Sequence, residues 1–138
     1  MKKIIITGGS GFIGSNLIKF LLKKNYIIIN IDKISYSSGS YNLKGLNKKK
    51  YRFVKLDINN RRKLSLILNK YKPDCVFNLA AETHVDRSID DPSSFISSNI
   101  LGTYNLLESL RIFKKKYKKN IKLIHVSTDE VYGDLKSN

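Results

Sequence analysis

The feature that most constrains this chain is an apolar run, Ile4 to Ile6, followed at once by the glycine-rich segment Thr7-Gly-Gly-Ser-Gly-Phe-Ile-Gly14. Apolar residues then recur at helical spacing, at positions 13, 17, 18 and 21. The pattern predicts a buried strand joined by a tight turn to an amphipathic helix. Gly8 permits the turn, Gly11 lets the backbone approach a pyrophosphate, and Gly14 lets the helix pack closely. We interpret the segment as a dinucleotide-binding turn.

The residues around this turn support the same interpretation. A second isoleucine-rich strand, residues 27–31, ends at Asp32, where an acid that binds the adenosine ribose is expected. The N-terminus of the first helix offers free N–H groups and a positive dipole end to phosphates. A glycine loop in an unrelated protein is the alternative, and the strand, helix and second strand in this order count against it.

Strand and helix patterns alternate along the whole chain. We expect strands at 2–7, 26–31, 51–55, 74–79 and 122–127, a polar loop at 35–42, and helices at 60–71 and 92–113. This order predicts an α/β fold with a doubly wound parallel sheet of the Rossmann type, forming one domain over residues 1–138. Ligands of such sheets sit at the carboxyl ends of the strands. The strand ends expected to converge on one crevice are Gly8 to Gly11, Asp32, Asp57, Leu79 to Thr83 and Thr128 to Glu130.

The expected helix at 92–113 carries apolar residues around much of its circumference. Asp91 reads as its N-cap and Pro92 as its first residue. The stripe predicted to form one face is Ile96, Ile100, Leu107 and Leu110. Further apolar residues lie off this stripe, namely Phe95, Leu101, Tyr104, Leu106 and Phe113. We therefore expect part of the helix to face something other than its own sheet.

Composition excludes several other classes of protein. The net charge of +15, with lysine clusters at 48–50 and 114–119, invites a nucleic-acid hypothesis. No zinc-ligand spacing, RNP-like strand or helix-turn-helix pattern accompanies these lysines, so we expect at most weak, salt-sensitive binding to polyanions.

No apolar run approaches the roughly 18 residues of a membrane span. We expect a cytoplasmic protein without a membrane partner, in which Cys75 is a packed thiol.

Four motifs together carry a closer resemblance. They are Thr7 to Gly14, Leu79-Ala-Ala-Glu-Thr-His-Val-Asp-Arg-Ser-Ile89, Asn99-Ile-Leu-Gly-Thr103 and Ser127-Thr-Asp-Glu-Val-Tyr-Gly133. The set resembles the dTDP-glucose 4,6-dehydratase family, nucleotide-sugar enzymes of the extended short-chain dehydrogenase/reductase type. Related epimerases and decarboxylases share the glycine turn and the Asn-x-x-Gly-Thr segment, but they do not usually combine Thr-Asp-Glu with Glu-Thr-His-Val-Asp-Arg-Ser.

The resemblance implies an NAD-dependent lyase that converts dTDP-glucose to its 4-keto-6-deoxy product and water. Oxidation at C4 of the sugar acidifies the C5 proton, water leaves across C5 and C6, and the hydride returns to C6. By resemblance, Glu130 removes the C5 proton, Asp129 protonates the departing 6-hydroxyl, and Thr128 contacts the sugar near C4. Adjacent carboxyls in an enclosed site can hold opposite protonation states. An ordinary solvated loop pair is the alternative.

The resemblance also implies a cofactor site and a substrate contact. The implied NAD contacts are Gly8, Gly11, Phe12, Ile13 and Gly14 at the pyrophosphate; Asp32, Lys33, Ile34 and Ser35 at the adenosine ribose; Asp57 and Ile58 at the adenine; and Leu79, Ala80, Ala81, Glu82, Thr83 and Ser98 on the nicotinamide side. Thr83 and Thr128 are the implied substrate contacts. The negative charge of Asp32 disfavours the extra phosphate of NADP and so predicts a preference for NAD. The positive charge of the neighbouring Lys33 weakens this prediction. We expect His84, Asp86 and Arg87 either to form a buried network that holds the substrate loop or to contact the substrate directly. We expect His125, within a strand, to have a packing role.

The chain departs from the family in one serious respect. The family's hydride step uses a Tyr-x-x-x-Lys pair on the helix after the fifth strand, and no such helix is predicted here. We interpret Tyr132 with Lys136, in a loop, and Tyr51 with Lys55, in a strand, as chance matches. We therefore expect the N-terminal part of a longer homodimeric enzyme, inactive alone and without the C-terminal substrate lobe. A sibling epimerase or decarboxylase and a non-catalytic NAD-binding module remain the alternatives.

Overall fold

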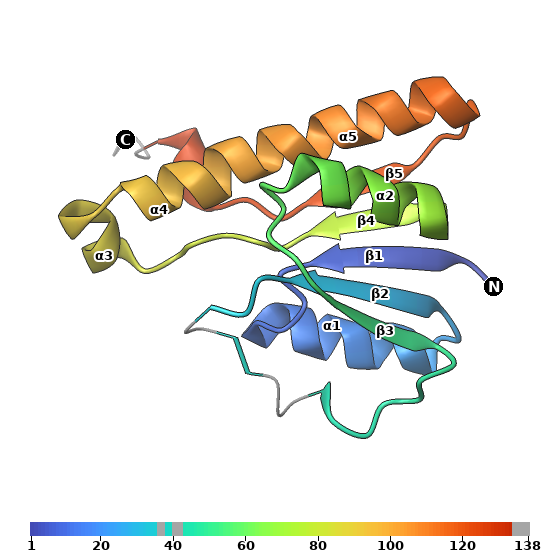
Figure 1. Cartoon of the computed structure of the whole chain (residues 1–138). Helices are drawn as coiled ribbons and strands as arrows, with labels where there is room; N and C mark the ends of the chain where they lie inside the picture. Colours follow the sequence, from blue (N-terminus) through green and yellow to red (C-terminus); the bar gives the residue numbers. More distant parts are fainter. Residues whose placement is uncertain (36–37, 40–42, 134–138) are drawn as a thin grey trace, which may run out of the picture.

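The chain folds around a five-stranded parallel sheet with the strand order β3-β2-β1-β4-β5 (Figure 1). A computed structural model describes residues 1–35, 38–39 and 43–133. The strands are β1 (Lys3–Thr7), β2 (Ile27–Asp32), β3 (Tyr51–Lys55), β4 (Cys75–Asn78) and β5 (Lys122–His125). Every neighbouring pair is parallel. The strand order reverses direction at β1, as the predicted doubly wound α/β plan requires, and that prediction is confirmed.

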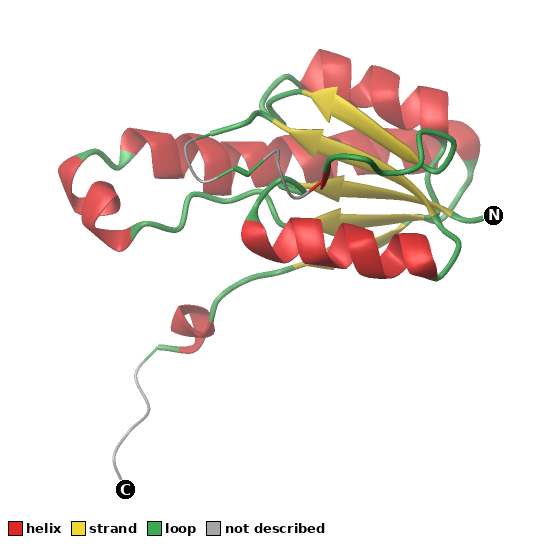
Figure 2. Ribbon diagram, turned by 90° about the horizontal axis from the view of Figure 1, so that it is seen from below, coloured by secondary structure: helices red, strands yellow, loops and turns green. Residues whose placement is uncertain are grey.

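Helices cover both faces of the sheet. One face carries α1 (Phe12–Lys23), and the other carries α2 (Arg61–Tyr71) and α5 (Gly102–Tyr117). In Figure 2 the strands lie between α1 in front and the other helices behind. Alternate residues of β1 face opposite layers: Ile5 packs in the core under α2 and α5, whereas Ile4 and Ile6 pack in the core under α1. Burial on both faces explains why the central strands read as unbroken apolar runs.

The expected helix at 92–113 is longer and less regular than predicted. It consists of α4 (Ser93–Phe95), the π-helical segment η2 (Ile96–Leu101) and α5, which continues to Tyr117. The predicted start is one residue too early, because the helix begins at Ser93 and its N-cap is Pro92. Asp91 nevertheless accepts a hydrogen bond from the backbone N–H of Ser93 at 3.0 Å. A short helix before it, α3 (Val85–Asp90), was not predicted, because its mixed polar sequence has no clear apolar stripe.

The predicted apolar stripe of this helix is largely wrong. Ile100 and Leu107 are 61% and 48% exposed, whereas Leu106 and Phe113 are 1% and 2% exposed and pack in the core. The wide turns of the π segment shift the helical phase between the two halves, and apolar residues on several sides leave the phase ambiguous in the sequence. Part of the helix does face away from its own sheet, as predicted, but Leu106 and Phe113, which were expected on that side, are buried. The exposed set is Ile96, Ile100, Leu101, Tyr104, Leu107 and Ile112.

Smaller corrections concern element ends. β5 ends at His125, so Val126 and Ser127 are not part of the strand. Ile13, expected on the buried stripe of the first helix, is 61% exposed, because the helix begins only at Phe12 and its first turn projects beyond the sheet. Cys75 is a half-buried free thiol, and burial raises its pKa.

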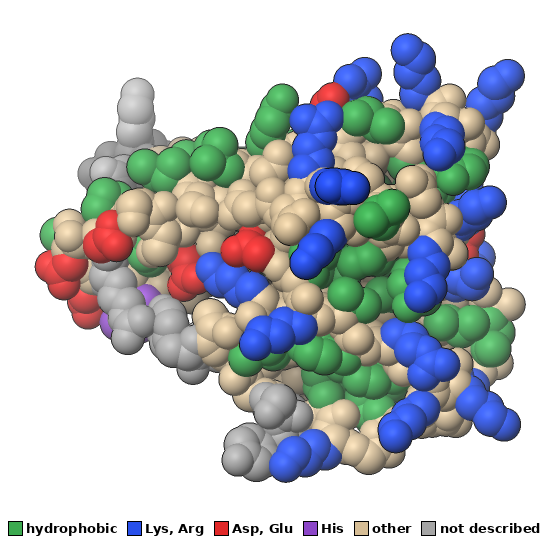
Figure 3. Space-filling model, viewed as in Figure 1, with side chains coloured by type: hydrophobic (Ala, Val, Ile, Leu, Met, Phe, Trp, Pro, Cys, Tyr) green, Lys and Arg blue, Asp and Glu red, His purple; other side chains and the backbone are tan. Residues whose placement is uncertain are grey.

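Charged residues are distributed unevenly over the surface. Lysines occupy the last turns of α1, α2 and α5, which all end near the amino ends of the parallel strands. Figure 3 shows Lys and Arg gathered at that end of the molecule and Asp and Glu more frequent at the opposite end, near α3. Cations at helix C-termini are favoured by the helix dipole. None of the helices in the described part of the chain combines the length and apolar character needed to cross a membrane.

Candidate functional site

The glycine turn between β1 and α1 is packed so tightly that side chains would not fit at Gly8, Gly9 or Gly14. Gly8 has φ +68°, and a Cβ there would lie 2.6 Å from the backbone of Leu79 and Ala80. A Cβ on Gly14 would lie 2.5 Å from the carbonyl oxygen of Gly8. At Gly11 the nearest atom to a Cβ would be 3.4 Å away, an ordinary contact. Gly11 therefore keeps open a space that the fold itself does not fill.

The N-terminus of α1 faces this turn without a competing anion. Gly11 is the N-cap, no side chain caps the helix, and its first turn contains no acidic residue. The first N–H groups of a helix lack partners within the helix and carry its positive dipole end. Together with the open backbone at Gly11, they form a cradle of the kind that binds phosphate groups.

Asp32, at the carboxyl end of β2, is the anchor of the next part of the site. Its carboxylate is 6% exposed and accepts hydrogen bonds from the backbone N–H of Ser10 at 2.9 Å and of Ile34 at 2.8 Å. The hydroxyl of Ser38 also donates to it, at 3.1 Å. A carboxylate has about four acceptor positions, so these three donors from the described residues leave one position for a further hydroxyl. These bonds hold Asp32 beside the turn and hold Ile34 at a φ of 59°, a strained value for a β-branched residue.

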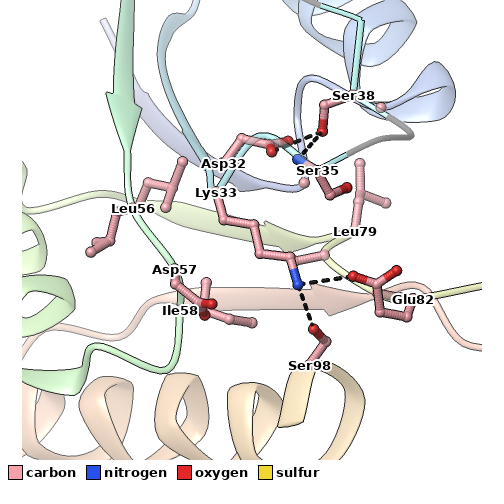
Figure 4. Close-up of a pocket in the computed structure, with 15 residues that line it drawn as sticks. Asp32, Lys33, Ser35, Ser38, Leu56, Asp57, Ile58, Leu79, Glu82 and Ser98 are labelled. Atoms are coloured by element: carbon pink, nitrogen blue, oxygen red, sulfur yellow. Dashed lines mark hydrogen bonds and ion pairs between the residues drawn. The ribbon is translucent and has the colours of Figure 1, made fainter. Parts of the chain in front are cut away.

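A pocket opens between the carboxyl ends of β1, β2, β3 and β4 (Figure 4). About 550 Å³ of space lies between its walls, and this figure includes space that is open to solvent. Its lining residues are Gly8, Gly11, Ile31, Asp32, Lys33, Ser35, Ser38, Leu56, Asp57, Ile58, Leu79, Ala80, Ala81, Glu82 and Ser98. Apolar walls with a few convergent polar groups are typical of nucleotide-binding pockets.

An ion pair crosses this pocket. Lys33 Nζ lies 2.9 Å from Glu82 Oε1 and donates to Ser98 Oγ at 2.9 Å. The Glu82 side chain is only 8% exposed. Its loop is held independently by Asn99, whose side-chain amide exchanges hydrogen bonds with the backbone N–H and carbonyl of Glu82. The loop after β4 therefore keeps its position without help from the Glu82 carboxylate.

Most of the residues predicted to bind a cofactor line this one pocket. Those on its wall are Gly8, Gly11, Asp32, Lys33, Ser35, Asp57, Ile58, Leu79, Ala80, Ala81, Glu82 and Ser98. Those away from its wall are Phe12, Ile13, Gly14, Ile34 and Thr83. Phe12 is 81% exposed, and Thr83 is also exposed. Gly14 is buried beneath the turn, where it acts on packing rather than as a wall of the pocket.

The predicted catalytic residues lie outside the pocket. Thr128 follows β5, and Asp129 and Glu130 begin the short helix η3 (Asp129–Tyr132). All three are exposed, and Thr128 Oγ1 donates to Glu130 Oε2 at 3.3 Å. In Figure 2 this short helix stands clear of the sheet. The expected convergence therefore holds for the ends of β1 to β4. Thr128, Asp129 and Glu130 do not take part in it, because they are exposed and are not among the residues that line the pocket.

Other predicted residues also have different surroundings from those expected. His84 and Asp86 are exposed, so they form no buried network, and the side chain of Arg87 is outside the described part. His125 is exposed rather than packed, and its Nδ1 lies 2.9 Å from Asn78 Nδ2. The two chance Tyr-x-x-x-Lys matches have different surroundings. Tyr51 and Lys55 lie in strand β3 rather than on a helix. Tyr132 is 87% exposed, and its partner in the spacing, Lys136, lies outside the described residues.

Three pocket residues were missed by the sequence analysis. Ile31 and Leu56 adjoin the predicted Asp32 and Asp57, so the strand-end rule would have found them if it had been applied one residue more widely. Nothing in the spacing distinguishes Ser38 from the other hydroxyl residues of its loop. Within the described residues, no group of His, Cys, Asp or Glu could hold a metal ion.

Comparison with known proteins identifies the family to which the chain belongs. A family model described as GDP-mannose 4,6 dehydratase matches residues 5–138. The chain belongs to this family. It is 44% identical to the dTDP-glucose 4,6-dehydratase of Salmonella typhimurium, over 96% of this chain and 38% of that protein. The predicted resemblance to dTDP-glucose 4,6-dehydratases is confirmed, and the chain spans only 38% of the length of this relative.

Solved structures of family relatives share the fold. The dTDP-glucose 4,6-dehydratase of Streptomyces venezuelae, crystallised with NAD and TYD, has a TM-score of 0.84 and 35% identity, over 99% of this chain and 42% of that chain. The UDP-glucose 4-epimerase of Thermotoga maritima, crystallised with UDP-glucose, has a TM-score of 0.82 and 33% identity, over 98% of this chain and 41% of that chain. The fold alone therefore does not distinguish dehydratase from epimerase.

Proposed function

We propose that this chain forms the NAD-binding part of a nucleotide-sugar 4,6-dehydratase that acts on dTDP-glucose. The observation that carries the proposal is that an open glycine turn and the buried carboxylate of Asp32 line the same pocket at the carboxyl edge of the sheet. Identity to dTDP-glucose 4,6-dehydratases over almost the whole chain supports the choice of reaction.

The residues of the pocket fit NAD. Gly8, Gly11 and the first N–H groups of α1 would hold the pyrophosphate, since a Cβ at Gly11 would occupy that space. Among the described residues, the donors to Asp32 leave an acceptor position for a ribose hydroxyl. Asp57 and Ile58 would border the adenine. Leu79 to Glu82 and Ser98 would border the nicotinamide side. Bound there, NAD supplies reversible hydride acceptance.

The carboxyls of Asp129 and Glu130 would serve the elimination of water. Glu130 would take the proton from C5 of the oxidised sugar, and Asp129 would give a proton to the oxygen leaving C6. Thr128 and Thr83 would hydrogen-bond the sugar. β5, which precedes these acids, lies next to β4, which precedes the pocket loop, so both groups leave the same edge of the sheet.

Two measurements test the proposal. Calorimetric titration with NAD at low and high salt should give saturable binding that salt weakens little, whereas binding to the lysine-rich surface would weaken steeply. In the longer protein that contains this chain, Asp129→Asn and Glu130→Gln should each slow dehydration by about 10²–10⁴-fold, with less effect on sugar oxidation. Product analysis with dTDP-glucose, UDP-glucose and UDP-glucuronate would identify an epimerase or decarboxylase instead.

We also propose that the exposed apolar face of η2 and α5 pairs with a second copy of the chain. Ile100, Leu101, Tyr104 and Leu107 are each about half exposed or more, and a contiguous apolar surface of this kind marks an interface. Sedimentation should show dimers that Leu107→Lys dissociates. Leu66→Lys, at a 60% exposed leucine on α2, is the matched control and should leave association unchanged.

A further inference from the structure

Lys33 is the residue of the pocket whose charge is hardest to reconcile with a preference for NAD. It follows Asp32 directly at the end of β2, and both residues line the pocket (Figure 4). NADP differs from NAD by a phosphate on the 2′-oxygen of the adenosine ribose, and a nearby cation is what accommodates that phosphate. On sequence alone, the lysine therefore opposes the discrimination provided by the carboxylate of Asp32.

The structure directs this cation elsewhere. The Lys33 side chain extends from the end of β2 toward the loop after β4, where its Nζ meets Glu82 Oε1 and Ser98 Oγ, each at 2.9 Å. Glu82 is 8% exposed and has Lys33 as its ion-pair partner. Loss of one partner leaves a buried charge uncompensated, which is strongly unfavourable. Lys33 is therefore held at Glu82 rather than being available to a second anion.

We propose that Glu82 is a positioning residue that determines the choice between NAD and NADP by holding Lys33 away from the 2′ position of the adenosine ribose. The inference rests on the proposed binding of NAD. Asp32 repels a 2′-phosphate directly, and Glu82 holds back Lys33, the one cation among the described residues of the pocket wall, which would neutralise that phosphate. The site thus distinguishes NAD from NADP through two carboxylates. Asp32 acts on the phosphate directly, and Glu82 acts by holding Lys33.

The test compares the dissociation constants of NAD and NADP, measured by calorimetry, for the unaltered protein and for Glu82→Gln. The glutamine keeps the shape of the side chain and removes the charge that holds Lys33. We expect NADP to bind more tightly relative to NAD by about tenfold, the order of effect of one released charge-assisted contact. Asp32 remains, so the preference should weaken rather than reverse.

Two further variants show whether the effect passes through Lys33. Lys33→Met combined with Glu82→Gln should return the ratio of the two dissociation constants to that of the unaltered protein. Glu108→Gln, which removes the same charge from an ion pair with Arg61 and Arg111 outside the pocket, should leave the ratio unchanged. Thermal unfolding of each variant verifies that the domain is folded.

Each outcome decides the question. A tenfold change in Glu82→Gln that disappears in the double variant supports the inference. An unchanged ratio, or an equal loss of both dinucleotides, overturns it and leaves Glu82 with only a structural role. If the unaltered protein binds neither dinucleotide, the proposed function itself fails, and the inference fails with it. Normal NAD binding with an unchanged ratio removes the inference alone.

Discussion

At the scale of single residues, the glycines of the first turn have distinct tasks. The packing of the turn requires glycine at positions 8 and 14, since a Cβ on Gly8 or Gly14 would lie within 2.6 Å of backbone atoms. Packing does not require glycine at position 11, because a Cβ on Gly11 would make only an ordinary contact. A motif that looks uniform in the sequence thus contains positions that the packing of the fold requires and one position, Gly11, for which we propose a role in ligand binding.

This difference predicts opposite effects of two substitutions. Gly14→Ala should destabilise the protein by about 1–3 kcal/mol, because backbone atoms must move to admit the methyl group. Gly11→Val should change the free energy of unfolding by less than about 1 kcal/mol while abolishing NAD binding. Chemical denaturation and NAD titration measure the two effects. Unchanged NAD affinity in Gly11→Val would remove the basis for placing the pyrophosphate at this turn.

At the scale of elements, the long helix shows how a local irregularity redirects a whole face. Six residues in π conformation, Ile96–Leu101, precede α5, and the residues buried after them are Leu106 and Phe113 rather than Leu107. Gly102, at the junction, approaches Ile58 so closely that a Cβ would lie 2.7 Å from it. The helix is therefore placed against the pocket wall by its π segment and this glycine.

Neighbouring leucines of α5 should consequently differ in their contribution to stability. Leu106→Ala should cost about 2–5 kcal/mol, since it leaves a cavity in the core under α2 and α5. Leu107→Ala should cost less than about 0.5 kcal/mol at concentrations where the protein is monomeric, since its side chain is half exposed. Denaturant titrations at low protein concentration measure both values. Equal costs would mean that the helix has a different rotation about its axis.

At the scale of the whole molecule, the pocket lies at the carboxyl ends of the strands, and the surface at the amino ends of the strands is rich in lysine. Asp74 lies among these lysines and joins three segments there. Its carboxylate accepts a hydrogen bond from the backbone N–H of Lys3 and pairs with Lys119, both at 2.8 Å. Lys119 Nζ also donates to the carbonyl oxygen of Lys72. The start of β1, the end of α2 and the turn before β5 are thereby connected.

The stability of the protein should therefore depend on acid through Asp74. The hydrogen bonds from Lys119 and from the Lys3 backbone hold the pKa of this carboxyl below its ordinary value. A carboxyl with a lowered folded pKa stabilises the protein above its unfolded pKa of about 3.9 and loses that contribution as pH falls through the folded value. Asp74→Asn should lower stability near neutral pH and flatten its decline below about pH 4. Unfolding curves at several pH values measure this, and parallel curves for both proteins would contradict it.

The alternating pattern of the sequence determined the order of strands and helices, the glycine turn and the gathering of Asp32, Asp57 and Leu79 to Glu82 at one edge. These follow from local periodicity and from the fact that parallel strands end on the same side. Only the tertiary structure decided which face of α5 is buried, that Ser38 reaches Asp32, that Lys33 turns to Glu82, and that Thr128 to Glu130 stand apart. Each of these depends on which segments distant in the chain pack together, and spacing along a sequence carries no information about that.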